Sequence, residues 1–308
     1  MRVAAIDVGT NSTRLLVAEE TGGGFRPLDR RMVLTRLGEG VDARRRLAPK
    51  ALKRTLATVA DYAASCGEYE VERLRVTGTS AVRDAHNRDE FLDGVRMLTG
   101  QTPELLTGDE EARVTFLGAV SDLDGDDCKL VVDIGGGSTE LVLGRREPES
   151  VVSMDVGSVR MFEKHLFSDP PTASEIDSLR ADVTGMLEIA RPEVQVPAGT
   201  RLIGVAGTVT QLATLKAGLS SYQPEVTHHA VLSHGDVRLM ARRLASLPYE
   251  KRARVKGLEP GRVDVIVAGA EILLSVMEVF DTAEMLVSER DILDGLVIEL
   301  LKQSTESV

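Results

Sequence analysis

The sequence predicts an α/β protein made of two related domains that face each other across a cleft. Two polar turns lie between matching apolar flanks, "AAIDVGTNSTRLLV" at 4–17 and "LVVDIGGGSTELVL" at 130–143. Each copy opens a series of strand and helix patterns, and 308 residues suffice for two domains of ordinary size. The polar "DGDD" marks the boundary. Domain I therefore covers 1–124 and domain II covers 125–290, and we expect the C-terminal helix, about 291–308, to pack back on domain I.

The first half is predicted to contain the following elements. "RVAAIDV" is a buried strand, "RLLVAEE" is a second strand after the turn, and extended sequence continues beyond "GGG" to about residue 37. Pro49 opens a helix that ends near Gly67, because Leu52, Leu56 and Val59 follow helical spacing. The remaining elements are a strand at 72–79, a helix at 87–100, a short extended segment at 103–108 and a helix at 109–123.

The second half repeats the opening pattern of strand, turn and strand. A further strand follows at 150–159, and Thr172 with Glu175 forms a capping-box signature for the helix at 173–190. The segment 200–215 predicts a strand, a glycine-containing turn and a helix. The last elements are helices between 233 and 280, a strand at 283–288 and a terminal helix at 290–302.

Composition and charge indicate a globular protein of the cytoplasm. Hydrophobic residues make up 43% of the chain and charged residues 28%, and the formal net charge is −11. This acidic balance argues against nucleic acid or an anionic membrane as a partner. The most apolar stretch, 265–280, is interrupted by Glu271 and Glu278, and the N-terminus lacks the apolar region of a signal peptide. Cys66 and Cys128 show no metal-ligand spacing, which favours reduced thiols.

The repeated turn is suited to binding phosphate. Glycine lets the backbone approach an anion closely, and backbone N–H groups in such a turn converge on it. The sequence excludes a Walker A loop, because no Gly-Lys-Ser/Thr is present, and each turn leads into a strand rather than the helix of a dinucleotide fingerprint. For one copy, a plain hairpin turn explains the residues as well as a phosphate-binding turn does. The presence of two matching copies favours phosphate binding. Hydroxyl groups that could add donors belong to Ser12, Thr13, Ser138 and Thr139.

Aspartates at the strand ends imply a divalent cation. Asp7 and Asp133 would lie beside the bound phosphate, where a carboxylate is repulsive unless a cation intervenes. Gly207 and Thr208, at the start of a predicted helix, form a third anion site, although many α/β proteins contain such turns.

The two turns differ in one charged position. Arg14 in the first copy corresponds to Glu140 in the second. If both side chains face the cleft, one turn is suited to an anion and the other to a metal or water.

Six segments spread over essentially the whole chain carry a resemblance to one enzyme family. The segments are "DVGTNSTRLLV", "GTSAVRDAHN", "TGDEEARVTFLGA", "DIGGGSTELVLG", "GVAGTVTQLA" and "RVDVIVAGAEIL". Together they resemble the exopolyphosphatase and guanosine pentaphosphate phosphatase family in its short form, within the superfamily of acetate and sugar kinases, Hsp70 and actin. The resemblance implies two actin-like, ribonuclease H-like domains with a cleft between them.

The resemblance also implies a reaction and assigns residues to it. The family releases terminal phosphate from inorganic polyphosphate or from guanosine penta- or tetraphosphate, with Mg²⁺ or Mn²⁺; K⁺ is a further candidate ion, and we expect a homodimer. By resemblance Glu111 is the catalytic glutamate, Glu140 and Asp133 handle metal or water with Asp7 beside them, and Arg83 contacts phosphate. The remaining predicted phosphate-binding residues are Gly9, Thr10, Asn11, Ser12, Thr13, Gly135, Gly136, Gly137, Ser138, Thr139, Gly207 and Thr208.

Several of these residues also have simpler explanations. Thr107 and Glu110 fit a capping box, so Glu110 needs no catalytic role. Arg83 could instead form a surface salt bridge. We assign no metal to His228 and His229, because no third ligand lies at a useful spacing, and we expect them to be structural.

Three functions therefore stay open at the level of sequence. The first is a metal-dependent exopolyphosphatase, a phosphoanhydride hydrolase that also accepts guanosine pentaphosphate. The second is an ATP-using, kinase-like enzyme of the same fold. The third is a regulator that binds polyphosphate or nucleotide without catalysis. Glu111 favours hydrolysis, because pure binding would not need a carboxylate so close to a polyanion.

Overall fold

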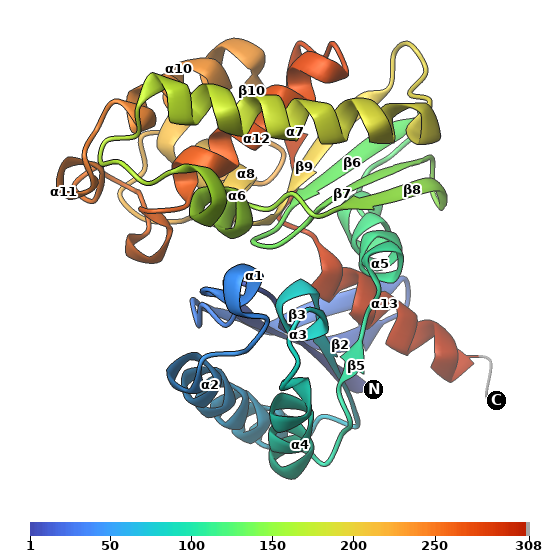
Figure 1. Cartoon of the computed structure of the whole chain (residues 1–308). Coiled ribbons are helices and arrows are strands. Elements are labelled where there is room, and N and C mark those ends of the chain that lie inside the picture. The colour runs from blue at the N-terminus through green and yellow to red at the C-terminus, as the bar shows by residue number, and fades with distance from the viewer. Residues whose placement is uncertain (306–308) are drawn as a thin grey trace. The chain divides into compact units, whose positions relative to one another are not determined.

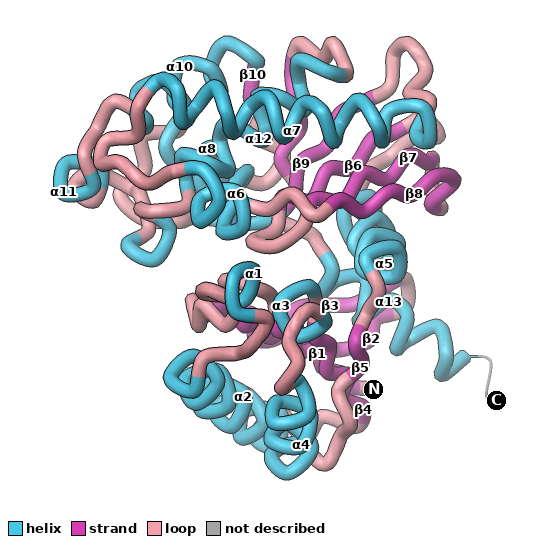
Figure 2. Tube along the Cα trace, in the orientation of Figure 1, coloured by secondary structure: helices cyan, strands magenta, loops and turns pink. Residues whose placement is uncertain are grey.

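The computed structural model describes residues 1–305 and divides into two compact units. Unit 1 contains Met1–Ser121 and the C-terminal segment from Arg290, and unit 2 is Asp122–Glu289. Each unit has one sheet with helices packed on it (Figures 1 and 2). The α/β class with two sheets predicted from the sequence is confirmed, whereas the cleft between the domains stays a prediction. Among the described residues, no helix has the length and apolar character needed to cross a membrane.

Unit 1 contains a five-stranded sheet in the order β3-β2-β1-β4-β5. The first three strands are antiparallel neighbours, and β4 and β5 continue parallel to β1. The strands are β1 (Arg2–Val8), β2 (Thr13–Thr21), β3 (Gly24–Val33), β4 (Arg73–Gly78) and β5 (Glu104–Leu105). The helices are α1 (Val41–Arg44), α2 (Pro49–Glu68), α3 (Ser80–Arg83), α4 (Arg88–Thr99), α5 (Gly108–Val120) and α13 (Ile292–Thr305).

Alternation along β1 creates two apolar faces on this sheet. Ala4, Ile6 and Val8 belong to the core that includes residues of α2 and α4. Val3 and Ala5 point the other way and belong to the core formed with α5 and α13. Figure 1 shows α2 and α4 together on one side of this sheet. Because successive side chains of a strand point to opposite faces, Asp7 lies on the α5 and α13 side.

Unit 2 repeats the connectivity of unit 1. Its sheet has the order β10-β11-β9-β6-β7-β8, in which β6, β7 and β8 are antiparallel neighbours and β9 and β11 run parallel to β6. The strands are β6 (Lys129–Ile134), β7 (Thr139–Gly144), β8 (Pro148–Met154), β9 (Arg201–Val205), β10 (Val231–Ser233) and β11 (Glu284–Val287). The helices are α6 (Ser158–His165), α7 (Ala173–Val194), α8 (Ala206–Lys216), α9 (Pro224–Thr227), α10 (His234–Ala245), α11 (Tyr249–Arg252), the 3₁₀ helix η1 (Pro260–Arg262) and α12 (Ile266–Val279).

Local signals in the sequence agree with most elements. Both predicted capping boxes form, at the starts of α5 and α7. The exception is the segment after β9, where no separate turn precedes the helix. β9 ends at Val205 and α8 begins at Ala206, which has a left-handed φ of 66°. One strained residue therefore makes the reversal that we expected a glycine turn to make.

Candidate functional site

The predicted site residues fall into two sets, one in each unit, and the two hairpin turns have the same backbone structure. The amide of Gly9 donates to the carbonyl oxygen of Ser12 at 2.9 Å, and the amide of Gly135 donates to that of Ser138 at 3.0 Å. A Cβ at Gly9 would lie 3.3 Å from the Ser12 oxygen, and one at Gly135 would lie 3.1 Å from the Ser138 oxygen. Such contacts are tight, so glycine suits both positions.

Backbone contacts from elsewhere in each unit fix the orientation of the turns. In unit 1, the carbonyl oxygen of Thr10 accepts from Gly38 at 2.8 Å and that of Asn11 accepts from Arg36 at 3.0 Å. In unit 2, the carbonyl oxygens of Gly135 and Gly136 accept from the amides that begin α6. Among the described residues, the amides at 10–12 and 136–138 have no acceptor. Both turns therefore present consecutive free N–H groups, as an anion site requires.

Asn11 adds a polar side chain to the first turn. Its side chain is buried, yet neither its amide nitrogen nor its oxygen has a hydrogen-bond partner among the described residues. Buried polar atoms are normally paired. The Asn11 carboxamide thus points to a ligand that the turn would hold.

The hydroxyl groups of the two threonines correct our expectation of phosphate contacts. Thr13 and Thr139 are fully buried at the starts of β2 and β7. The Thr13 hydroxyl lies 2.8 Å from that of Thr35, and the Thr139 hydroxyl donates to the carbonyl oxygen of Val156 at 2.5 Å. Both side chains stabilise their turns through these buried hydrogen bonds, so their hydroxyl groups do not line a phosphate site.

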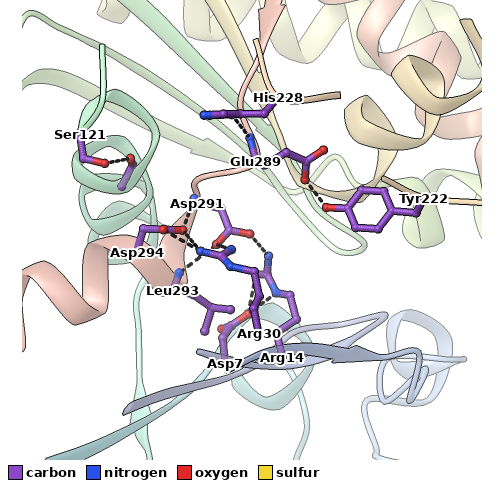
Figure 3. A network of polar contacts seen from close by, with 11 residues as sticks. Asp7, Arg14, Arg30, Ser121, Tyr222, His228, Glu289, Asp291, Leu293 and Asp294 are labelled. Carbon is purple, nitrogen blue, oxygen red and sulfur yellow. Dashed lines mark hydrogen bonds and ion pairs between the residues drawn. The ribbon is translucent and has the colours of Figure 1, made fainter. Parts of the chain in front are cut away.

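The charged pair beside the first turn is neutral overall. Asp7 and Arg14 are cross-strand neighbours of β1 and β2, and an Arg14 nitrogen lies 2.6 Å from an Asp7 oxygen. The other Asp7 oxygen accepts from the Thr77 hydroxyl at 3.1 Å. Arg14 also pairs with Asp291 at the start of α13 (Figure 3). Because both Asp7 oxygens have partners within unit 1, the expected metal-ligand role of Asp7 loses its support.

The corresponding pair beside the second turn consists of two acids. Asp133 and Glu140 are cross-strand neighbours of β6 and β7 in the same register. Their exposed fractions are 7% and 1%, and Glu140 accepts from the Ser153 hydroxyl at 2.8 Å. Two buried carboxylates on one face of a sheet repel each other, and a cation bound between them would relieve that repulsion. This pair therefore fits a divalent cation, for which carboxylate oxygens are suitable ligands.

Glu111 and Arg83 lie together in unit 1. Glu111 is in the first turn of α5, and its carboxylate lies 3.5 Å from the Arg83 guanidinium. Arg83 also donates to the carbonyl oxygen of Leu106 at 2.5 Å. The structure thus brings the predicted catalytic acid next to a predicted phosphate-binding arginine.

Glu110, one residue before Glu111, has a different role. Its carboxylate accepts from the backbone amide of Thr107 at 2.8 Å and closes the capping box. That amide and the Thr107 hydroxyl hold the pKa of Glu110 below its usual range. Glu110 therefore stabilises the start of α5, as predicted.

Sequence reasoning missed two arginines near the predicted turns of unit 2. The Arg160 guanidinium donates to the carbonyl oxygen of Gly137 at 2.8 Å. Arg262 lies over Gly207, where any Cβ would collide with its guanidinium, and pairs with Glu259 at 2.8 Å. Arg262 thus places positive charge at the start of α8, where helix amides also attract anions. Arg262 is the first residue of "RVDVIVAGAEIL", one of the segments that carry the family resemblance. Spacing along the sequence does not show that residue 262 lies near residue 207.

Thr208, in contrast, is directed away from solvent. Its side chain is buried, and a Cβ at Gly269 of α12 would lie 2.6 Å from its hydroxyl oxygen. The hydroxyl therefore packs against α12. Any phosphate contact from Thr208 would come from its backbone amide.

The histidine pair has a neighbour that the sequence did not reveal. His228, His229 and Asp122 offer three ligand-type atoms within 4.8 Å of one another. Asp122 lies 106 residues away along the chain, so spacing along the sequence could not identify it as a neighbour of the two histidines.

Comparisons with known proteins identify the family to which this chain is similar. Residues 16–304 match the model of the Ppx/GppA phosphatase family. The chain is 39% identical over 313 residues to Exopolyphosphatase 2 of Mycobacterium tuberculosis, covering 97% of this chain and 98% of that protein. It is 26% identical to a guanosine-5'-triphosphate,3'-diphosphate pyrophosphatase of Photobacterium profundum, covering 97% of this chain and 59% of that one. The crystal structure of the Aquifex aeolicus member of the Ppx/GppA family matches with a TM-score of 0.84 and 32% identity, covering 98% of each chain.

Proposed function

Because the chain belongs to the Ppx/GppA phosphatase family, we propose that it is an exopolyphosphatase, which releases terminal orthophosphate from inorganic polyphosphate by water attack. The observation that carries this proposal is the buried pair Asp133 and Glu140 beside a turn with free amides. An anion-binding turn next to two carboxylates suits a phosphoanhydride bound together with a divalent cation.

The proposed division of labour follows the contacts of each residue. The amides at 10–12 and 136–138 bind phosphate oxygens, with the Asn11 carboxamide as a further donor. Arg83 offers a planar fork of N–H donors to the same kind of oxygen. Glu111 orients the attacking water and accepts its proton, and the contact with the nearby Arg83 guanidinium orients the glutamate carboxylate.

We propose that Mg²⁺ or Mn²⁺ is held by Asp133 and Glu140. When bound, the ion would offset the negative charge that develops on the transferring phosphoryl group. Ser153, by donating to Glu140, fixes the orientation of one of the two carboxylates. K⁺ as a further ion, the cytoplasmic location and the homodimer stay predictions. Light scattering during size-exclusion chromatography would measure the oligomeric state.

Guanosine pentaphosphate is a second candidate substrate, favoured by the similarity to the Photobacterium profundum enzyme. This chain spans 59% of that relative, so the similarity covers only part of the larger enzyme. The kinase-like and regulatory alternatives differ in what they release. A kinase would consume ATP only with an acceptor, and a regulator would bind polyphosphate without releasing phosphate.

The proposal is tested by measuring phosphate release from short polyphosphate, long polyphosphate, guanosine pentaphosphate and ATP in parallel, with Mg²⁺ and with Mn²⁺. We expect metal-dependent release from polyphosphate without any acceptor. Binding of polyphosphate with no release under either metal would contradict hydrolysis and support the regulatory alternative.

A further inference from the structure

His228 connects the two segments through which the chain passes between its units. The chain leaves unit 1 after Ser121 and returns to it at Arg290. The first and last residues of unit 2 are thus Asp122 and Glu289, and His228 contacts both. Its Nε2 lies 2.7 Å from a carboxylate oxygen of Asp122. The backbone amide of Glu289 donates to its Nδ1 at 3.1 Å, as Figure 3 shows.

The surroundings of His228 hold its ring in place. The ring of His229 stacks on it, with centroids 3.8 Å apart and an angle of 28° between the planes. The Glu289 carboxylate accepts hydrogen bonds from the hydroxyl groups of Tyr222 and Thr227. Because its stacking partner and both hydrogen-bond partners are defined, His228 is a fixed bridge and not a mobile surface side chain.

The contact with Glu289 determines the tautomer of His228. A backbone N–H can only donate, so Nδ1 must accept and carries no proton. In a neutral imidazole the proton then lies on Nε2, which donates it to Asp122. One ring thus acts as acceptor toward one connecting segment and as donor toward the other.

The same reasoning opposes a metal at this cluster. Asp122, His228 and His229 have the ligand types of a zinc site and lie close enough together. A histidine that binds metal through one nitrogen almost always donates from its other N–H. Here the other nitrogen, Nδ1, accepts a hydrogen bond from the Glu289 amide and carries no proton. Binding metal through Nε2 would therefore leave the ring without any proton.

Each connecting segment leads to a predicted site residue of unit 1. Asp122 follows α5, whose first turn carries Glu111. Two residues beyond Glu289, Asp291 pairs with Arg14, which pairs with Asp7 beside the first phosphate turn (Figure 3). We propose, on the basis of the proposed function, that His228 is a positioning residue for phosphohydrolysis, whose Nε2–H tautomer joins these segments and so orients Glu111 and Arg14.

Two matched variants separate the halves of the bridge. In His228→Gln the side-chain amide can replace the Nε2–H donor to Asp122, but no acceptor remains for Glu289. In His228→Asn the side-chain oxygen can replace Nδ1 as acceptor, but the donor to Asp122 is lost. Hydrogen exchange at the Glu289 amide should accelerate about tenfold or more in His228→Gln and stay near the wild-type rate in His228→Asn.

The same variants should divide the kinetic parameters for polyphosphate. His228→Asn releases the segment after α5 and should lower kcat about tenfold with little change in KM, whereas His228→Gln should mainly raise KM. Equal kinetic losses in both variants, or unchanged exchange at Glu289 in His228→Gln, would overturn the positioning role. Absence of phosphate release by the wild-type protein would instead contradict the proposed function, and the exchange measurement would still test the bridge.

Zn²⁺ titration tests the competing metal site directly. The control is His229→Gly, which removes one ligand at a position with a left-handed φ of 61° that glycine accepts readily. We expect no specific Zn²⁺ binding by the wild-type protein at this cluster. Stoichiometric binding that His229→Gly and His228→Gln both abolish would overturn the proposed tautomer.

Discussion

Asp133 and Glu140 lie directly opposite each other on β6 and β7, in the register where the first hairpin pairs Asp7 with Arg14. One duplicated position therefore carries a neutral pair in unit 1 and two acids in unit 2. In unit 1 the positive charge belongs to the chain, since Arg14 supplies it. In unit 2 both cross-strand positions are acidic, and we infer that a divalent cation binds to them, which gives the two hairpins different tasks in the proposed reaction.

Asp133→Ala and Glu140→Ala should each reduce kcat by about 100-fold or more and shift the metal titration to higher concentrations. Each variant removes one of two carboxylates that hold the ion, and an ion that polarises phosphoryl oxygen contributes several kcal/mol. The measurement is phosphate release across a series of Mg²⁺ and Mn²⁺ concentrations. If both variants keep the wild-type titration curve, the metal is held elsewhere.

Asp7→Asn is the matched control for this pair, because Asp7 occupies the equivalent position beside the first turn. It should leave the metal titration unchanged and lower stability by about 1–3 kcal/mol, since a hydrogen bond between charged groups is weakened. Thermal unfolding measures the stability. A strong shift in metal dependence would restore Asp7 as a ligand.

Cys128 should react with thiol reagents well before Cys66 in the folded protein. Burial raises the pKa of the Cys66 thiol to about 11, while Cys128 is only partly buried. At pH 8 the thiolate, which is the reactive form, would make up only about 0.1% of Cys66. Iodoacetamide labelling followed by peptide mass spectrometry measures both sites. In Cys128→Ser the native protein should stay unlabelled and become labelled after unfolding in urea; rapid labelling of native Cys66 would contradict its burial.

Local features of the fold could be predicted from the sequence because they depend on neighbours along the chain. The hairpins follow from glycine turns between apolar runs, and the capping boxes follow from residues three positions apart. Strand alternation could also have predicted the direction of two threonine side chains. Thr13 has the same parity as Leu15, and Thr139 the same parity as Leu141, so both side chains face the core. Our expectation of phosphate contacts overlooked this alternation.

Features that depend on distant residues were not predictable from spacing. The partner of Arg14, Asp291, is 277 residues away along the chain, and the third residue of the histidine cluster is 106 residues away. β10 joins the edge of the second sheet with only three residues, too few for a periodic signal. Such pairs arise when strands and helices pack, so only the structure reveals them.

Glu271→Gln should stabilise the protein at neutral pH. Glu271 is buried in α12, one of its oxygens has no hydrogen bond among the described residues, and burial raises the pKa of its carboxyl. A raised acid pKa gives stability that is fully present below the unfolded value of about 4.5 and lost as the pH rises through the folded pKa. At pH 7.5 the variant should therefore unfold about 2–4 °C higher than the wild type.

The difference in unfolding temperature between Glu271→Gln and the wild type should shrink as the pH falls toward 5. Glu278→Gln is the control, because Glu278 is partly exposed and pairs with Arg180 at 2.5 Å. It should show no gain at pH 7.5. Equal gains in both variants would mean that the helix responds to net charge and not to burial of Glu271.

Glu111→Gln should remove most turnover and leave substrate binding nearly intact. Glutamine keeps the shape of the side chain but cannot accept a proton from the attacking water, and loss of a general base costs about 10²–10⁴ in rate. Neutralising a carboxylate beside a polyanion removes repulsion, so affinity should hold or improve. The adjacent Glu110→Gln is the control, because Glu110 closes the capping box and glutamine serves there too. The measurements are kcat and the substrate Kd for both variants. If Glu110→Gln lost as much kcat as Glu111→Gln, the assignment of the catalytic role to Glu111 would be wrong.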